Sequence, residues 1–425
     1  MEVKHAKRLV SSLFANDSSV SGKVRFWEGS EISFGREAPA FVIHFKIPDA
    51  MDAILSDLSI GFGEAYARGD IEVEGDLGEV MSLAYKEHLF SKFSTAQKVR
   101  LGWLNLRNKT SLKQTKKDVQ AHYDRGNSFY KLWLDKGLNY SCAYFGSNDD
   151  SLEQAQLQKI HHTLHKLRLR PGLRLLDIGC GWGSLVIEAA RSYGVRTVGL
   201  TIAENQYEFG CRRIDKEGLS DKAKIRLQDY REVPDEEQGT YDRIVSIGMF
   251  EHVGKENIPV FFEKVTKLLR PRGLLLLHTI ARLKPKPVDS WIRKNIFPGG
   301  YIPALGEVIE AAQDVGLGFL DLEDLRLHYD LTLGRWIERF EANVSQIRQM
   351  MGRQFVRMWR LYLHGSQRSF RNDKLHVFQL LYSRGCREDW TLIRDNFAET
   401  SVADDYAQKT QSAALLQFAG HCEVR

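Results

Sequence analysis

Long apolar runs are absent from this sequence, and their absence excludes one class of protein. No stretch of its 425 residues approaches the ~18 to 20 continuous apolar residues that a membrane span requires. The opening residues 1–7 are polar and contain no apolar core of the kind found in signal peptides. We therefore expect a cytoplasmic protein.

Cysteine is also scarce, and its spacing does not suit a metal site. The five cysteines are odd in number and show no paired metal-ligand spacing. Reduced thiols and no bound metal are therefore expected. These residues are Cys142, Cys180, Cys211, Cys386 and Cys422.

Acidic residues are missing from the stretch 98–117, which carries seven basic ones. The net charge of +5 is too small to identify a partner by itself. A basic run attracts either nucleic acid or an anionic membrane surface. Trp103 and Leu104 among the bases would suit a membrane interface, and a flexible connection between domains explains the run equally well. The bases are Lys98, Arg100, Arg107, Lys109, Lys113, Lys116 and Lys117.

The length of the chain indicates two domains, because one ordinary core does not accommodate so many residues. We place a small α+β domain at 1–97, a basic linker at 98–118 and a larger domain at 119–425. The small domain could hold acyl chains or only support the larger one. Its expected elements are antiparallel strands at 23–27, 31–34 and 40–46, a helix at 49–58, a glycine-punctuated turn at 61–70 and a helix after Asp76.

Strand-like and helix-like segments alternate through the larger domain. This alternation predicts an α/β fold with a doubly wound, mostly parallel sheet and with ligands at the carboxyl ends of its strands. The expected strands are 173–178, 195–200, 224–227, 241–247, 273–280 and 375–382. The expected helices are 153–167, 184–192, 203–217, 257–269, 331–350 and 353–371.

The chain is organised around the strand 173–178, which leads into three alternating glycines, Gly179, Gly181 and Gly183. A turn without Cβ atoms lets a ligand approach the backbone, and the N-terminus of the next helix would suit a carboxylate group. Asp177 precedes the first glycine by two residues, whereas the dinucleotide fingerprint is Gly-x-Gly-x-x-Gly with a later acid. The pattern favours a different cofactor, although close helix packing alone also explains a glycine turn.

Two polar-aromatic stretches, 120–127 and 138–145, do not look like regular helices or strands. Their tyrosines indicate either a wall of the active site or half-buried aromatic rings with satisfied hydroxyl groups. A third stretch, 281–300, mixes basic and aromatic residues. A mobile flap over a membrane-borne substrate and an ordinary surface insertion both explain it. Its exposed-looking apolar residues are Trp291, Ile292, Ile296 and Phe297.

Several motifs follow one another along the larger domain: His122-Tyr-Asp124, Tyr140-Ser-Cys-Ala-Tyr-Phe145, Leu176-Asp-Ile-Gly-Cys-Gly-Trp-Gly183, Gly199-Leu-Thr201, Asn205-Gln206, Ser246-Ile-Gly-Met-Phe-Glu-His-Val253, His278-Thr-Ile280, Ile296-Phe-Pro-Gly-Gly300 and His328-Tyr329. In these motifs the chain resembles the bacterial cyclopropane-fatty-acyl-phospholipid synthases and, through them, the mycolic acid cyclopropane synthases. The resemblance covers 119–384, and the amino-terminal domain is also similar to that of the phospholipid enzymes. It implies the seven-stranded, Rossmann-like sheet of a class I methyltransferase.

The resemblance implies that a methylene from S-adenosyl-L-methionine is added across a cis double bond of an unsaturated phospholipid acyl chain. It implies a bound bicarbonate as general base, held by the catalytic residues Cys142, Glu251, His278 and Tyr329 and by the backbone of Ile280. The residues that would contact the cofactor are Tyr140, Ser141, Asp177, Gly179, Gly181, Gly183, Thr201, Gln206, Tyr230 and Arg231. Relatives often have an acid where Arg231 stands, so contacts to adenine are expected to shift towards Asp229.

The resemblance further implies a homodimer, peripheral association with the inner face of the membrane and no nucleic-acid partner. One departure is Ser366, which stands where the family commonly has a cysteine and argues against a covalent nucleophile there. The alternatives are methyl transfer to another lipid, a small molecule or RNA, and a lipid-binding protein without turnover. The intact set of catalytic residues argues against the last of these, and the preferred head group and double-bond position stay open.

Overall fold

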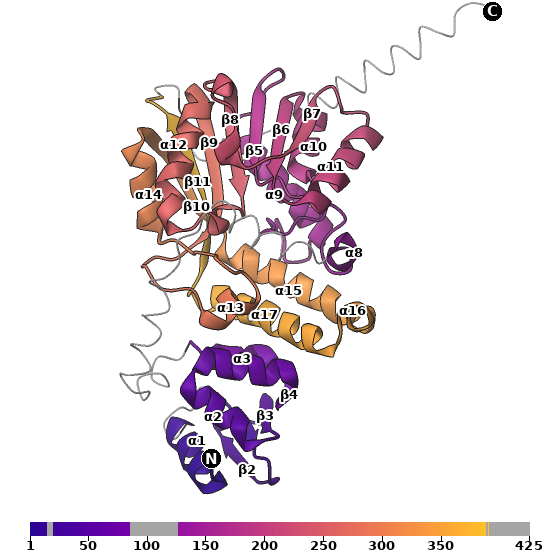
Figure 1. Ribbon diagram of the computed structural model, residues 1–425, viewed down its shortest axis with the longest axis vertical. Coiled ribbons are helices and arrows are strands. Elements are labelled where there is room, and N and C mark those ends of the chain that lie inside the picture. The colour runs from indigo at the N-terminus through magenta and orange to yellow at the C-terminus, as the bar shows by residue number, and fades with distance from the viewer. Residues whose placement is uncertain (15–19, 86–125, 388–389, 391–425) are drawn as a thin grey trace, which may run out of the picture.

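Two β-sheets organise the chain in the computed structural model, which describes residues 1–14, 20–85, 126–387 and 390 (Figure 1). The smaller sheet belongs to the amino-terminal part of the chain and the larger sheet to the remainder. Two regions discussed above lie outside the described residues: the basic run 98–117, and most of the stretch 120–127 with its motif His122-Tyr-Asp124.

The larger sheet has the strand order β10-β11-β9-β8-β5-β6-β7, and only β11 runs antiparallel to its neighbours. Its strands are β5 (Arg174–Ile178), β6 (Arg196–Thr201), β7 (Ala223–Leu227), β8 (Tyr241–Ile247), β9 (Leu269–Ala281), β10 (Leu317–Asp324) and β11 (His376–Arg384). The α-helices are α8 (Asn127–Tyr130), α9 (Leu152–Lys166), α10 (Ser184–Tyr193), α11 (Glu204–Lys216), α12 (Ile258–Leu268), α13 (Ser290–Asn295), α14 (Leu305–Asp314), α15 (Arg326–Ala342), α16 (Val344–Met351) and α17 (Arg353–Arg371). Short 3-10 turns are η1 (Tyr230–Glu232), η2 (Asp235–Glu237), η3 (Phe250–His252) and η4 (Lys255–Asn257).

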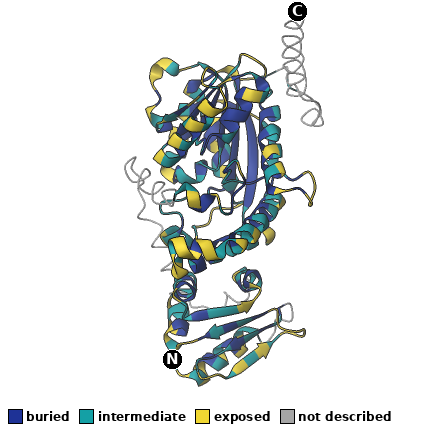
Figure 2. Ribbon diagram, turned by 90° about the vertical axis from the view of Figure 1, so that its right-hand side faces the viewer, coloured by how far each residue is buried: buried dark blue, intermediate teal, exposed yellow. Residues whose placement is uncertain are grey.

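The apolar core lies on both faces of this sheet, whose strands are buried between helices (Figure 2). Along β9, Leu274 and Leu276 pack with α9 and α10, whereas Leu275 and Leu277 pack with α12 and α14. Successive side chains of a strand point to opposite faces, so a nearly continuous apolar strand suits a sheet that is covered on both sides. The predicted doubly wound, mostly parallel α/β sheet is therefore confirmed.

Helix boundaries beyond β10 differ from the prediction of one helix over 331–350. Two helices, α15 and α16, meet there at Asn343, whose side-chain amide donates to the carbonyls of Leu132 and Arg339. Because α15 begins at Arg326, Tyr329 lies in its first turns. The elements α14 and β10 lie between the predicted flap and α15 and were absent from the expected set.

The small sheet has the order β2-β1-β3-β4. Its strands and helices are α1 (Val3–Phe14), β1 (Gly22–Arg25), β2 (Glu31–Phe34), β3 (Phe41–Phe45), α2 (Pro48–Ser56), α3 (Leu58–Arg68), β4 (Ile71–Gly75) and α4 (Leu77–Leu83). The all-antiparallel prediction is wrong, because the hairpin strand β2 takes the outer edge and β3 crosses to the other side of β1, where it runs parallel. The predicted turn at 61–70 is also wrong, since most of it belongs to α3.

The two parts of the chain contact each other through helices. In the amino-terminal part, α3 and α4 pack on α17 of the larger part, and α3 also packs on α13. Trp291 of α13 is 4% exposed, so the expectation that it is exposed is wrong, and Ile296 is buried as well. A Cβ atom on Gly63 of α3 would lie 2.3 Å from the Trp291 ring. The glycine that suggested a turn is thus a place where a helix accepts an indole from the stretch 281–300.

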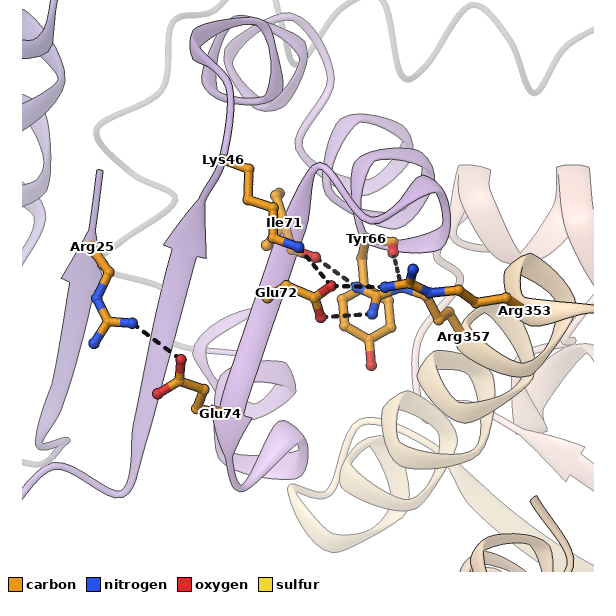
Figure 3. Close-up of polar contacts among 8 residues, drawn as sticks. All are labelled: Arg25, Lys46, Tyr66, Ile71, Glu72, Glu74, Arg353 and Arg357. Atoms are coloured by element: carbon orange, nitrogen blue, oxygen red, sulfur yellow. Dashed lines mark hydrogen bonds and ion pairs between the residues drawn. The ribbon is translucent and has the colours of Figure 1, made fainter. Parts of the chain in front are cut away.

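Polar groups secure the same contact (Figure 3). The guanidinium of Arg357 in α17 donates to the carbonyls of Tyr66 and Ile71 and pairs with Glu72 at 2.7 Å. It also lies 4.2 Å from the centroid of the Tyr66 ring. With these three hydrogen bonds, the buried Arg357 holds α17 against β4 and α3.

Candidate active site

The glycine loop after β5 takes up the left-handed backbone that its sequence predicts. Gly179, Gly181 and Gly183 have φ angles of 88°, 54° and 85°, which residues with a Cβ rarely adopt. The N–H groups of Gly179 and Cys180 donate to the carbonyl of Leu200, so the loop is fixed to the end of β6.

The three glycines serve different purposes. A Cβ on Gly179 would lie 2.5 Å from Met249, and one on Gly181 would meet no atom within 4 Å. A Cβ on Gly183 would lie 2.7 Å from Ile225, so this glycine permits α10 to pack on the sheet. Gly179 and Gly181 line a cavity, and Gly183 does not.

That cavity lies at the carboxyl ends of β5, β6, β7 and β8, where the fold predicts a ligand. It brings together all of the predicted cofactor residues other than Gly183: Tyr140, Ser141, Asp177, Gly179, Gly181, Thr201, Gln206, Asp229, Tyr230 and Arg231. Residues that were not predicted also line it, among them Lys159, Met249 and His252. Burial lowers the pKa of His252 to about 4, so its imidazole is neutral at physiological pH.

Asp177 is a buried acid of the cavity. Its Oδ1 atom has no hydrogen-bond partner among the described residues, and its side chain is 3% exposed. Burial raises its pKa to about 7, and the charge of Lys159 opposes that rise. A buried carboxylate oxygen without a donor is costly, so this atom is well suited to receive a donor from a ligand.

The η1 turn and the end of β6 also line the cavity. Arg231 donates through Nε and Nη2 to both carboxylate oxygens of Asp229, at 2.9 and 2.8 Å. This ion pair accounts for a basic residue at the position where the resemblance leads one to expect an acid. The hydroxyl of Thr201 donates to Gln206 Oε1 at 2.8 Å, which leaves the amide NH2 of Gln206 as a donor.

The loop that carries Tyr140 and Ser141 is held from two sides. Asp135 accepts hydrogen bonds from the N–H groups of Gly137 and Asn139. The hydroxyl groups of Tyr140 and Tyr362 are 2.7 Å apart, and the Tyr140 ring packs among aromatic side chains. Tyr140 is therefore a half-buried ring with a satisfied hydroxyl group, and it also lines the cavity. Tyr123, in the other stretch, lies outside the described residues.

A second group of polar side chains lies beside the cavity. Glu251 in η3 accepts a hydrogen bond from the N–H of Ile280 through Oε1 at 2.6 Å, and its buried Oε2 has no partner among the described residues. Burial raises the pKa of Glu251 to about 7, while the Ile280 N–H opposes the rise. His278 and Ile280 are two residues apart on β9 and so share one face of the strand.

His278 is a neutral imidazole. Burial lowers its pKa well below the ordinary value, and the nearby charges of Lys159 and Lys166 lower it further. Its Nδ1 lies 3.3 Å from Gln379 Nε2, whereas Nε2 is buried without a partner in the described part of the chain. His278 is adjacent in the sheet to Ile247, which lines the cavity.

Cys142 and Tyr329 belong to one apolar cluster, against which Ile280 packs. The thiol of Cys142 is buried, lies 3.8 Å from the carbonyl of Leu325 and has a raised pKa because of its burial. The structure therefore joins Glu251 to Ile280 directly and places Cys142 near Tyr329. None of the four predicted catalytic side chains lines the cavity described above. No cluster of metal-ligating side chains occurs within the described residues.

Comparison with known proteins covers both parts of the chain. The family described as mycolic acid cyclopropane synthetase matches residues 110–380, and a domain of unknown function, DUF7884, matches residues 9–95. A probable fatty acid methyltransferase of Pseudomonas putida is 34% identical over 368 residues, covering 84% of this chain and 91% of its own. The cyclopropane-fatty-acyl-phospholipid synthase of Escherichia coli K12 is 37% identical over 358 residues, covering 83% of this chain and 90% of that enzyme.

Solved structures show the same similarity for the larger domain. The cyclopropane synthase MmaA2 from Mycobacterium tuberculosis has a TM-score of 0.60 and 35% identity, covering 63% of this chain and 98% of its own. The mycolic acid cyclopropane synthase CmaA1, in a complex with SAH and CTAB, has a TM-score of 0.60 and 34% identity at the same coverage. The larger domain thus has the fold of a class I methyltransferase.

Proposed function

This chain belongs to the mycolic acid cyclopropane synthetase family, and we propose that it adds a methylene from S-adenosyl-L-methionine across a cis double bond of an unsaturated phospholipid acyl chain. The observation that carries the proposal is the position of two polar side chains, the half-buried Glu251 and the buried His278, beside the glycine-loop cavity. Each has one polar atom without a partner in the described part of the chain. A cofactor cavity next to a buried acid-base group suits methyl transfer followed by proton removal.

The residues that line the cavity offer hydrogen-bonding groups and space that suit S-adenosyl-L-methionine. Asp177 presents a carboxylate oxygen without a partner among the described residues, Gly181 leaves room for backbone approach, and Gln206 offers its amide NH2. When bound, S-adenosyl-L-methionine supplies an electrophilic methyl group on a sulfonium. We assign its binding to the cavity residues from Tyr140 to Arg231 that the sequence predicts.

The chain must then hold an alkene, which is a weak nucleophile, in line with that methyl group. Positioning of this kind is worth up to ~7–11 kcal/mol in favourable systems. Methyl transfer leaves positive charge on the acyl chain, and the faces of Tyr140 and Tyr329 can stabilise a cation by their ring quadrupoles. Tyr329 belongs to a buried hydrophobic cluster, and Tyr140 packs against it.

We further propose that bicarbonate removes the proton that lets the ring close. An amphoteric anion needs both hydrogen-bond donors and hydrogen-bond acceptors. Both are offered by the neutral thiol of Cys142, by the neutral imidazole of His278 and by the Ile280 segment with Glu251. Turnover should therefore fall in carbonate-depleted buffer and return when bicarbonate is added. Unchanged turnover would leave His278 as the remaining candidate for the base.

Peripheral membrane association is proposed from the exposed segment that follows β9. Within the described residues, no helix combines the length and the apolar character of a membrane span. Leu283 is 60% exposed, and Lys284 and Lys286 beside it are exposed as well. An apolar side chain flanked by bases suits an anionic lipid surface. A homodimer, which would double such a surface, is proposed from the family resemblance and can be tested by light scattering.

The decisive experiment uses the purified protein, cofactor with a trideuterated methyl group, and vesicles of unsaturated phospholipid. Ring closure removes one deuteron, so a cyclopropane product carries two deuterium atoms, and the mass of the acyl chain reports this directly. A product with all three would favour simple methyl transfer, the second candidate, which the name of the Pseudomonas putida relative supports. No change in acyl mass would contradict both.

A further inference from the structure

Lys159 lies in the wall of the cofactor cavity, and the proposed reaction gives it no role. It belongs to the inner face of α9 and is only 2% exposed. Its ammonium group donates one hydrogen bond in the described part of the chain, to Ser141 Oγ at 2.9 Å. A lysine ammonium has three donors, so two are left without an acceptor among the described residues. A buried charge in this situation is costly unless an anion completes its shell.

Ser141 extends the same donor site. Its Oγ accepts from Lys159, so the hydrogen of its hydroxyl group remains available to donate. Its position is fixed, because Gln156 Nε2 donates to the Ser141 carbonyl at 2.8 Å. The wall therefore presents a rigid cluster of donors to the cavity, and such a cluster recognises an anionic acceptor.

The opposite charge lies nearby in the same cavity. Asp177 and Lys159 are close enough for each to influence the ionisation of the other, but no hydrogen bond or ion pair joins them in the described part of the chain. Asp177 keeps one carboxylate oxygen without a partner, as described above. One cavity thus carries a buried cation and a buried anion that do not neutralise each other by contact, an arrangement that is complementary to a zwitterion.

We propose that Lys159 and Ser141 bind the α-carboxylate of the cofactor's amino-acid end, while Asp177 binds its α-ammonium group. This inference rests on the proposed function, because it names the groups that select the cofactor. Lys159 is then a specificity-determining residue, which distinguishes ligands with a complete amino-acid end from those that lack the carboxylate.

The electrostatic setting of Lys159 agrees with this role. Burial lowers its pKa to about 8, and the charges of Asp135 and Asp177 act in the opposite direction. Near neutral pH the group is mostly protonated, and an incoming carboxylate would favour its charged form further.

Calorimetric titration with the thioether product S-adenosylhomocysteine and with its decarboxylated 3-aminopropyl analogue tests the inference without turnover. The wild type should prefer the complete thioether by about 10- to 100-fold, as expected for a charge-assisted contact. Lys159→Met should bind both ligands with similar affinity. Lys166→Met is the matched control, since Lys166 is a buried lysine of the same helix that pairs with Glu323 and does not line the cavity. That variant should lose stability and keep the preference.

The outcomes separate this inference from the function on which it rests. A wild-type protein that binds both ligands equally overturns the role of Lys159 and leaves the proposed function intact, and this comparison needs no folded variant. A Lys159→Met protein that keeps the full preference overturns it as well. A wild-type protein that binds neither ligand overturns both the inference and the assignment of the cofactor.

Discussion

Glu251 accepts a hydrogen bond from the backbone of Ile280 through one carboxylate oxygen, and its other oxygen has no partner in the described part of the chain. The Oε1 atom accepts the Ile280 N–H at 2.6 Å, and Oε2 has no partner among the described residues. An acid tied to the β9 backbone in this way is fixed in space while half of its hydrogen-bonding capacity remains for a ligand. The first prediction concerns that free oxygen.

Glu251→Gln should lower turnover by about 100-fold or more while cofactor affinity changes little, because the damaged contact is made mainly in the transition state. Steady-state kinetics together with calorimetric binding of S-adenosylhomocysteine measure the two effects. Glu256→Gln is the control, since Glu256 is exposed in the nearby η4 turn. Near-normal turnover of Glu251→Gln would remove Glu251 from the mechanism.

Asp177→Asn should weaken cofactor binding and should stabilise the folded protein by an amount that depends on pH. Burial raises the folded-state pKa of Asp177 from 3.8 to about 7, so the folded protein binds a proton that the unfolded chain has already lost between these values. The contribution of Asp177 to stability therefore falls as pH rises through that window. Above pH 7 the variant should gain unfolding free energy, at most about 4 kcal/mol, and below pH 4 the gain should vanish.

Urea unfolding at several pH values tests this prediction, and S-adenosylhomocysteine binding to the same variant should weaken throughout. A stability difference that does not change with pH would contradict the raised pKa of the Asp177 carboxyl group.

Gly179→Ala should damage the cofactor loop because a Cβ there would lie 2.5 Å from Met249. We expect a loss of about 1–3 kcal/mol in stability, together with weakened cofactor binding. Gly172→Ala is the matched control, since Gly172 has nearly the same φ and no atom within 4 Å of the added Cβ. That variant isolates the cost of the left-handed backbone. Equal binding by both variants would mean that the contact with Met249 has no effect on the cavity.

Arg357→Ala should uncouple the small domain from α17. The substitution leaves two backbone carbonyls and Glu72 without their buried donor. We expect it to lower the free energy of unfolding by about 3–5 kcal/mol. Arg353→Ala removes a 62% exposed arginine that pairs with the same Glu72 (Figure 3) and should cost about 1 kcal/mol or less. If the two variants unfold alike, Arg357 does not hold the domains together.

Binding to anionic vesicles should depend on the exposed bases after β9. The double change Lys284→Glu/Lys286→Glu should weaken co-sedimentation with vesicles, and ~1 M salt should release the wild type because the Debye length falls to about 3 Å. Lys216→Glu/Lys224→Glu makes the same change in net charge at exposed positions of α11 and β7. Equal losses in the two double variants would point to net charge alone.

Much of the larger domain follows from local sequence. The apolar strand before Asp177, the glycines with positive φ and the regular alternation of strands and helices are properties of a few neighbouring residues. Backbone sterics and side-chain periodicity act at that range. The predicted cofactor residues also lie together, apart from Gly183, because parallel strands present their carboxyl ends at one edge of the sheet.

Only the tertiary structure decided the features that depend on a distant partner. In the sequence, Trp291 cannot be told from an exposed flap residue. It is buried because Gly63, more than two hundred residues earlier, leaves space for its ring. Lys159 reads as an ordinary polar position in a helix, and it becomes part of the cavity because α9 packs its inner face against the loop that carries Ser141. Burial and charge pairing depend on what lies across the interface, and no local pattern contains that information.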